Sequence, residues 1–277
     1  MVILLSLGAA LSYGTGDFLG GSASRRAAPL AVLLVSTPIG LVALLAVAFL
    51  TPGTPTWAAF GWGALAGLAG GVGLPILYAA LAAGPMSVVA PVSALTAALL
   101  PIGYALVIGE QLSAQVYLGV ALCLAAIALV SLERTNDRRR VRPGRGAVLA
   151  FASGSGFGLF FVVIRQADEA TGMWPLVGSR GAAVLVAVVA VMALAVRVSG
   201  ERTVVALAVA AGLFDALGNM FYLLAVRAGL LSLAAVITSL YPAVTVLLAR
   251  LVHTERLRRI QGLGLLVAGL GVALLAA

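Results

Sequence analysis

The chain has 277 residues, of which 62% are apolar and 9% charged. A soluble domain has roughly 25% charged residues, so this composition excludes a water-soluble fold and indicates an integral membrane protein. The formal net charge is +8, and all seventeen basic residues are arginines, nearly all of them between apolar segments. This placement is typical of loops that set membrane topology, and it argues against a nucleic-acid partner.

No metal or other cofactor is expected. The single cysteine, Cys123, lies in an apolar run and excludes an internal disulfide, and the single histidine, His253, has no Cys or His neighbour. The N-terminal stretch "MVILLSLGAA" lacks a positive n-region and continues into an apolar segment, so no cleavable signal peptide is expected.

Ten apolar stretches are long enough to span a bilayer, whose core of about 30 Å requires about 20 residues as a helix. Their continuous apolar character disfavours the alternating strands of an outer-membrane barrel. The predicted fold class is therefore an all-α polytopic membrane protein with ten transmembrane helices. The expected spans are residues 2–22, 29–50, 57–81, 87–108, 113–132, 146–166, 174–197, 203–226, 231–252 and 257–276.

The first span contains the stretch "SYGTGDFLGG", which places a carboxylate, Asp17, eight residues before Arg25. An ionisable group inside a span costs at least about 2.5 kcal/mol, so it is expected to face a cavity or a partner. Asp17 and the nearby Tyr13 are candidates for a substrate or proton pathway. The alternative for Asp17 is that it pairs with a buried arginine or marks a helix end.

The third and fourth spans carry hydroxyls beside prolines. Pro75, Pro91 and Pro101 each remove a backbone donor and can kink their helices. Tyr78 and Thr96 are candidates to line the space beside the kink that Pro242 is expected to make in the ninth span. The alternative is a hydrogen bond from the hydroxyl to its own helix backbone, which is the commoner arrangement.

The seventh span contains Arg180, which cannot lose its charge. It therefore needs an acid, backbone carbonyls or a wet cavity. Asp17 and Asp215 are its candidate partners, and recognition of an anionic substrate is the alternative.

The eighth span holds Asp215 near its middle, between Arg202 and Arg227. Asn219 and Tyr222 follow at i+4 and i+7, so the three side chains share one helix face. This stripe of acid, amide and phenol is the strongest candidate for the substrate or proton site. The alternative is an interhelical hydrogen-bond clasp that only fixes packing.

In the ninth span, Pro242 is expected to kink the helix and free backbone groups near Ser239 and Tyr241. Freed groups are tolerated only against a cavity or another helix. The fourth and ninth spans end in Glu110 and Glu255, whose repetition indicates an architectural role.

The chain repeats itself. An offset of 145 aligns residues 80–119 with the C-terminal region, including Glu110 with Glu255. The sequence thus divides into a first five-helix unit at 1–132, a basic connecting loop at 133–145 and a second five-helix unit at 146–277. After an odd number of spans the second copy starts from the opposite side, so the copies must be inverted. Inverted repeats are a common construction of secondary transporters, with the site between them near the midplane.

Arginines are distributed unequally between the two sides. The odd-numbered connections hold fourteen of them, and the even-numbered connections hold only Arg165 and Arg227. The positive-inside rule then places the odd connections in the cytoplasm and both termini outside.

With these features the chain resembles the drug/metabolite transporter superfamily, in its ten-helix branch with the EamA-type repeat. The resemblance is carried by "YG" at 13–14 and "FG" at 157–158, by "ALAAGPMSVVAPVSAL" and "AVRAGLLSLAAVITSLYP", and by "LVIGEQLS" and "LVHTERLR". It implies a central cavity lined by the first, third, fourth, sixth, eighth and ninth helices, and no universal catalytic residue. Many relatives have both termini in the cytoplasm, contrary to the arginine count.

The function predicted from these features is secondary transport of a small metabolite or drug across the cytoplasmic membrane by alternating access. Export is the expected direction, a proton is the candidate coupling ion, and the protein is a monomer or a homodimer in the lipid bilayer. A non-transporting scaffold or regulator is the alternative, and it predicts no polar cavity between the repeats. A membrane enzyme is disfavoured, because no nucleophile with a base is found and the glycine-rich stretches follow no strand.

Overall fold

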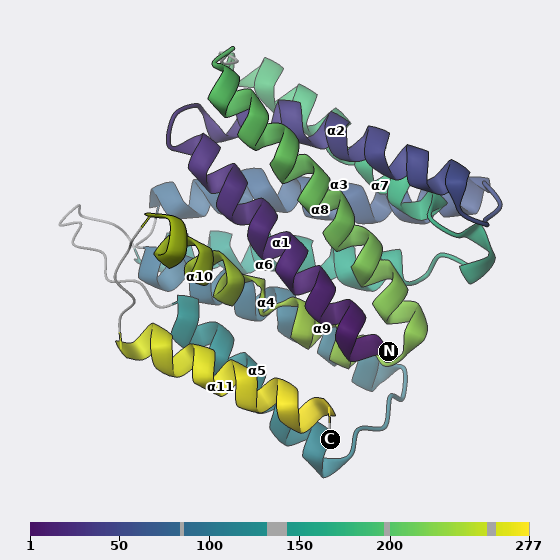
Figure 1. Ribbon diagram of the computed structural model, residues 1–277, viewed down its shortest axis with the longest axis vertical. Coiled ribbons are helices and arrows are strands. Elements are labelled where there is room, and N and C mark those ends of the chain that lie inside the picture. Colours follow the sequence, from purple (N-terminus) through teal and green to yellow (C-terminus); the bar gives the residue numbers. More distant parts are fainter. Residues whose placement is uncertain (84–85, 132–142, 197–199, 254–258, 277) are drawn as a thin grey trace.

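The computed structural model describes residues 1–83, 86–131, 143–196, 200–253 and 259–276, and every regular element in them is helical (Figure 1). The helices are α1 (Val2–Ser24), α2 (Pro29–Leu50), α3 (Trp57–Ala83), α4 (Met86–Val107), α5 (Ala114–Ser131), α6 (Pro143–Ile164), a short 3-10 helix η1 (Glu169–Thr171), α7 (Trp174–Ala193), α8 (Arg202–Ala228), α9 (Leu231–Thr238), α10 (Tyr241–His253) and α11 (Arg259–Ala276).

The helices form ten membrane spans, because α9 and α10 together make up the ninth. Within the described residues, eight are long and apolar enough to cross a bilayer, and two shorter apolar helices, within α4 and α5, complete the set. In lipid a helix satisfies its own backbone groups, which is why continuous apolar sequence folds in this way. Proline stands in the first turn of α2 and of α7, where its missing donor costs nothing. The predicted fold class is confirmed.

The ninth span is a broken helix. Thr238 ends α9 and Tyr241 begins α10, so the helix is interrupted at 239–240. Pro242 explains the break, because it has no N–H to donate to the carbonyl of Thr238 four residues earlier. The kink predicted beside this proline is therefore present. It lies against α1, where the Thr245 hydroxyl donates to the Gly14 carbonyl at 3.1 Å.

Each five-helix unit makes the same kind of contact with the other. Helix α1 packs along α8, and its counterpart α6 packs along α3. A Cβ added to Gly14 would lie 2.5 Å from Val244 Cβ, and one added to Gly158 would lie 2.9 Å from Leu100 Cβ. Each residue of the first pair is 144 positions from its counterpart in the second. Both glycines are therefore required by the same close helix crossing, and the units form inverted repeats around a pseudo-twofold axis.

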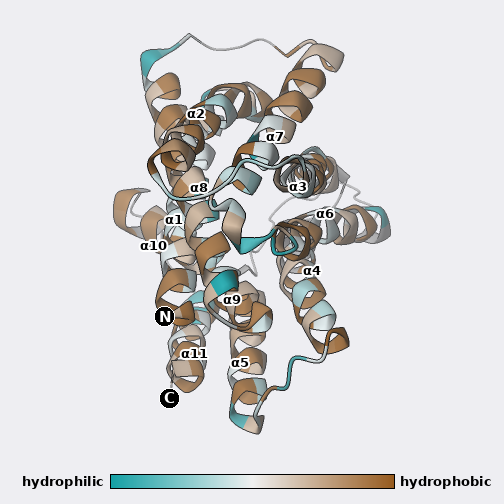
Figure 2. Cartoon of the chain, turned by 90° about the vertical axis from the view of Figure 1, so that its right-hand side faces the viewer, coloured by the Kyte–Doolittle hydropathy of each residue, from teal (hydrophilic) through white to brown (hydrophobic). Residues whose placement is uncertain are grey.

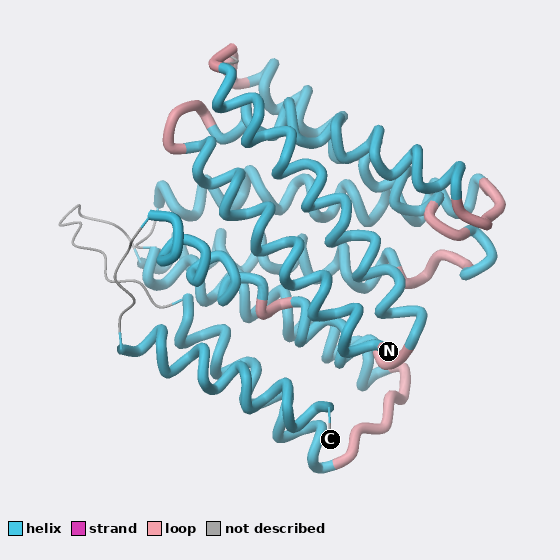
Figure 3. The backbone as a smooth tube through the Cα atoms, viewed as in Figure 1, coloured by secondary structure: helices cyan, strands magenta, loops and turns pink. Residues whose placement is uncertain are grey.

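The helix ends lie on two sides of the bundle, and both termini lie on the same side (Figures 1 and 3). We call the opposite side, at which α1, α5, α7 and α10 end, the basic side. There the Arg26 guanidinium pairs with Glu201 at 3.3 Å, across the connections into α2 and α8. Hydrophobic residues cover most of the helices between the two ends (Figure 2). Exposed apolar side chains such as Phe49 and Leu266 are suited to lipid contact.

Opposite the basic side, residues 51–56 pack against residues 165–173, and we call this contact the seal. The Thr54 amide donates to the Ala170 carbonyl at 3.0 Å. A Cβ added to Gly53 would lie 2.8 Å from Gly172 Cα, so the two backbones touch. The Arg227 guanidinium at the end of α8 donates to the Gly172 carbonyl at 2.7 Å and to the Asp168 carbonyl at 3.1 Å. The seal thus joins α2, α3, α6, α7 and α8 at one side of the bundle.

Candidate functional site

A cavity of about 600 Å³ lies between the two repeats. Its walls come from α1, α2, α3, α4, α6, α7, α8 and α10. The expectation from the family resemblance omitted α2 and α7, which both contribute. A volume of this size is in the range of small-molecule sites.

The cavity runs from the middle of the bundle to the basic side. Its deep end is lined by Tyr13, Asn219 and Tyr241, which lie midway along their spans. Its other end is lined by Ser24 at the end of α1 and Pro29 at the start of α2, both at the basic side. The cavity therefore approaches one side of the membrane, while the seal lies at the other.

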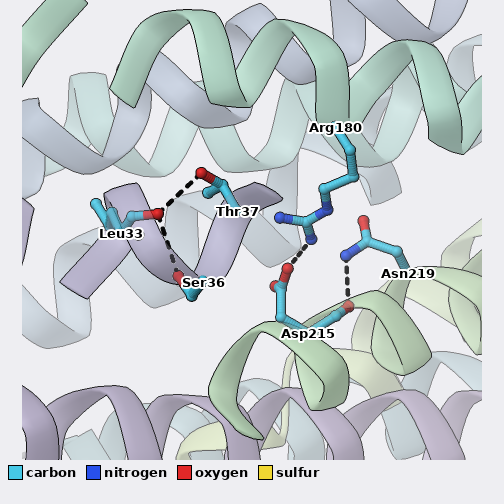
Figure 4. Close-up of polar contacts among 6 residues, drawn as sticks. All are labelled: Leu33, Ser36, Thr37, Arg180, Asp215 and Asn219. Carbon is cyan, nitrogen blue, oxygen red and sulfur yellow. Dashed lines mark hydrogen bonds and ion pairs between the residues drawn. The ribbon is translucent and has the colours of Figure 1, made fainter. Parts of the chain in front are cut away.

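A charged pair stands in the cavity wall. The Arg180 guanidinium of α7 forms an ion pair with the Asp215 carboxylate of α8 (Figure 4). The Arg180 side chain is only 12% exposed, whereas that of Asp215 is 38% exposed toward the cavity. Glycines bring α2 and α8 together beside this pair: a Cβ on Gly212 would lie 2.2 Å from the Ser36 carbonyl oxygen, and one on Gly40 would lie 3.1 Å from the Gly212 carbonyl oxygen. The sequence left Asp17 and Asp215 as candidate partners of Arg180, and in the structure the partner is Asp215.

Asp17 lies in the same cavity but is separate from this pair. Its carboxylate is exposed into the cavity, one turn from Tyr13 on the same face of α1. It makes no hydrogen bond or ion pair with any residue that the structure describes. The cavity thus holds one paired and one unpaired carboxylate.

The two tyrosines at the deep end face each other across the break in the ninth span. The rings of Tyr13 and Tyr241 are in edge contact, with centroids 6.5 Å apart. The Tyr13 hydroxyl is buried and has no hydrogen-bond partner among the described residues. It is therefore a buried polar group beside the deep end of the cavity whose hydrogen-bonding capacity is unused by the described residues.

Asn219 and Tyr222 follow Asp215 on one face of α8, as the spacing predicts, but only Asn219 reaches the cavity. The Asn219 amide donates to the backbone carbonyl of Asp215 at 2.7 Å. Tyr222 is fully buried, and its hydroxyl donates to the Phe161 carbonyl of α6 at 3.0 Å. Tyr222 therefore joins α8 to α6, which corresponds to the clasp alternative.

Of the remaining candidates, those whose side chains the structure describes do not line the cavity. The Thr96 hydroxyl donates to the Val92 carbonyl of its own helix at 2.7 Å, and Ser239 is buried at the helix break. Glu110 accepts hydrogen bonds from the Leu231 amide at 2.7 Å and from the Ser232 hydroxyl at 2.7 Å, so it caps the N-terminus of α9. The side chain of Tyr78 and all of Glu255 lie outside the described residues.

The sequence reasoning missed the wall opposite the charged residues. There α6 presents Phe157, Phe160 and Phe161, and α3 presents Gly70 and Gly71. The signal was present in the repeat offset, which places Phe161 at the position of Asp17. In the part of the chain that the structure describes, no three His, Cys, Asp or Glu side chains gather to hold a metal ion.

Comparisons with known proteins agree with this architecture. The profile of the EamA-like transporter family matches residues 1–132 and 144–277. The chain belongs to the EamA-like transporter family. This family is part of the drug/metabolite transporter superfamily, so the protein is a multi-pass membrane transporter with a small-molecule substrate, and its family consists of transporters rather than enzymes.

Two further comparisons concern curated sequences and solved structures. No curated protein sequence matches this EamA-like transporter. A crystal structure described only as that of a protein superposes with a TM-score of 0.79 at 19% identity, covering 99% of this chain and 96% of the other. At this identity the likeness concerns the fold alone, which is the same ten-helix arrangement over the whole chain.

Proposed function

We propose that this protein is a secondary transporter that exports a small organic molecule across the cytoplasmic membrane by alternating access. The main support for the proposal is that the central cavity is closed more tightly toward one side of the helix bundle than toward the other. The cavity between the repeats reaches the basic side, and the seal closes the other side. Inverted repeats supply the two equivalent arrangements that alternating access requires, because either unit can take the role of the other.

The arginine distribution supports the direction. If the basic side faces the cytoplasm, as the positive-inside rule favours, the cavity is loaded from the cytoplasm. Release on the other side then requires residues 51–56 to separate from residues 165–173. That movement breaks the backbone hydrogen bond from Thr54 to Ala170, whereas the Arg227 hydrogen bonds hold residues 165–173 in the closed position.

Proton coupling is the second part of the proposal, and it rests on the two cavity carboxylates. Asp17 has no partner among the described residues, so a proton can neutralise it without breaking any contact. Protonation of Asp215 would instead weaken its pair with Arg180. We therefore assign the coupling proton to Asp17 and the conformationally sensitive contact to the Arg180–Asp215 pair.

A disulfide across the seal tests the proposal. In a Cys123→Ala background, Thr54→Cys and Ala170→Cys place two thiols where the backbones already touch. Proteoliposomes loaded with a mixture of amino acids, nucleosides and organic cations are followed by mass spectrometry of the released compounds. Oxidation should stop release and reduction should restore it.

The two single-cysteine variants are the matched controls, and oxidation should leave release by each of them unchanged. Unchanged release from the oxidised double variant, with the cross-link confirmed by gel mobility, would overturn alternating access through the seal. Release of no compound by the reduced protein would overturn the transport proposal for this mixture and these coupling conditions.

A further inference from the structure

The two walls of the cavity are related by the repeat but differ in chemistry. In the sequence repeat, Asp17 is equivalent to Phe161 and Gly16 to Phe160 at an offset of 144. Asp215 is equivalent to Gly70 at an offset of 145. The spatial contacts follow the same relation. A Cβ on Gly16 would lie 3.4 Å from the Asp215 amide nitrogen, and one on Gly70 would lie 3.5 Å from Phe160 Cβ. One half-site is thus charged, and its counterpart is aromatic.

The charged wall carries two carboxylates and one guanidinium. Arg180 is already paired with Asp215, whereas Asp17 has no partner among the described residues. A carboxylate inside a span is stabilised by an opposite charge, and here that charge must come from solution. An anion would have to displace Asp215 from Arg180 and would be repelled by Asp17. The charge arrangement therefore favours a ligand with one positive charge.

The opposite wall is apolar. It is lined by Phe157 and Phe160 of α6 and by Leu74 and Leu77 of α3, and Gly70 leaves room on α3 for the Phe160 side chain. Aromatic rings pack favourably against other flat apolar groups and attract cations at their faces. A ligand that touches both walls is therefore expected to have a flat apolar group at one end and its charge at the other.

We infer that the cavity binds a small organic monocation with a flat apolar group, with the charge at Asp17 and the flat group against the apolar wall that α6 and α3 form together. This inference rests on the proposed function and names the substrate class of the same site. It also explains why the repeat does not keep both halves alike: each wall binds a different end of one molecule.

Four probes that differ in charge or in the presence of an aromatic group test this inference. Their binding is measured by titration calorimetry on the purified protein in detergent. The probes are 2-phenylethyltrimethylammonium, the zwitterion phenylalanine, the anion 3-phenylpropionate and tetramethylammonium. The first should bind at least about tenfold more tightly than the other three, because only it pairs with Asp17 and also fills the apolar wall. Asp17→Asn should remove this preference.

Substitutions on α3 test the apolar wall separately. Gly70→Leu should weaken binding of 2-phenylethyltrimethylammonium by at least about tenfold, because a side chain there meets Phe160 and takes up space at the apolar wall of the cavity. The matched control is Gly61→Leu in the same helix, where an added Cβ meets nothing within 4 Å and binding should be unchanged.

Tighter binding of the anion or the zwitterion, unchanged binding by Asp17→Asn, or binding of none of the probes by cooperatively melting protein would each overturn the inference. These binding measurements require no translocation, so they can contradict the inferred ligand class without contradicting the proposed transport. Conversely, a protein that binds the cation but releases no compound from vesicles would contradict the proposed function alone.

Discussion

Arg180 of α7 is paired with Asp215 of α8 across the wall of the central cavity, and both residues belong to the second repeat. Their counterparts in the first repeat are uncharged. Gly212 meets Ser36 as Gly67 meets Ser179, which puts Thr37 at the position of Arg180, and Gly70 lies 145 before Asp215. The pair is therefore not a requirement of the fold. It is a charge arrangement added to one half of a symmetric framework, at the surface that a ligand would contact.

Neutralising one member of this pair should destabilise the protein. Asp215→Asn leaves the Arg180 guanidinium, only 12% exposed, without its counterion. Removal of one partner of a buried pair costs about 3 kcal/mol or more, so the melting temperature in detergent should fall clearly. The double variant Arg180→Met with Asp215→Leu should recover most of the stability but not release from vesicles. Equal melting of Asp215→Asn and the native protein would show that the pair contributes little.

Loss of the Glu110 carboxylate should destabilise the N-terminus of α9, the first part of the broken ninth span. Glu110 accepts from the Leu231 amide and from both the amide and hydroxyl of Ser232, so it satisfies donors at the N-terminus of α9. Glu110→Ala should cost about 1–2 kcal/mol, and Glu110→Gln should cost less because the amide oxygen still accepts. Thermal unfolding measures both. Gln111→Ala, at the exposed neighbouring position, is the control that should leave stability unchanged.

The overall fold followed from the sequence because bilayer thickness fixes helix length. Ten apolar stretches of about 20 residues became ten spans, and Pro242 located the break between α9 and α10. Pro38 shows the limit of that reasoning, because it lies inside a continuous α2. Whether a proline breaks a helix depends on the neighbours that receive the freed carbonyl, and those neighbours are set by tertiary packing.

The site was harder to predict, because periodicity gives the face of a helix but not the depth of a cavity. Asp215, Asn219 and Tyr222 do share a face of α8, yet Tyr222 lies about 10 Å beyond Asp215 along the helix. At that depth α6 closes against α8, and Tyr222 bonds to the Phe161 carbonyl instead of lining the cavity. Similarly, nothing in the sequence distinguished Asp17 from Asp215 as the partner of Arg180, since that choice depends on how α7 crosses α8.

Removal of the Tyr222 hydroxyl should affect stability without affecting release. Tyr222→Phe keeps the fully buried ring against Phe161 and deletes one hydrogen bond of 3.0 Å, leaving a buried carbonyl with one acceptor site unfilled. The expected loss is about 1 kcal/mol, measured by thermal unfolding. Release from vesicles at a temperature well below melting should equal that of the native protein. A strong loss of release by folded Tyr222→Phe would return this residue to the list of substrate contacts.

Weakening the seal should shift the protein toward the opposite orientation. Arg227→Gln removes the charge that donates to the Gly172 and Asp168 carbonyls, so residues 165–173 are held less firmly. Thr171, only 3% exposed, then becomes a reporter. In a Cys123→Ala background, Thr171→Cys should react faster with a membrane-impermeant maleimide when Arg227→Gln is added. Gln111→Ala, at an exposed position in the connection between α4 and α5 and outside the seal, is the control and should leave the labelling rate unchanged.

Proton coupling predicts a specific loss in Asp17→Asn. In the native protein, a pH gradient that is acidic on the sealed side should accelerate release of the transported compound, because protons entering on that side exchange for substrate at Asp17. The asparagine side chain fills the same space but cannot exchange a proton, so release should follow the substrate gradient alone and ignore the pH gradient. Asp17→Glu should keep the response. Glu201→Gln, which removes an acid on the basic side outside both the cavity and the seal, controls for a general change in charge. A pH response that persists in Asp17→Asn would assign the coupling proton to another group, and Asp215, as the second cavity carboxylate, would be tested next.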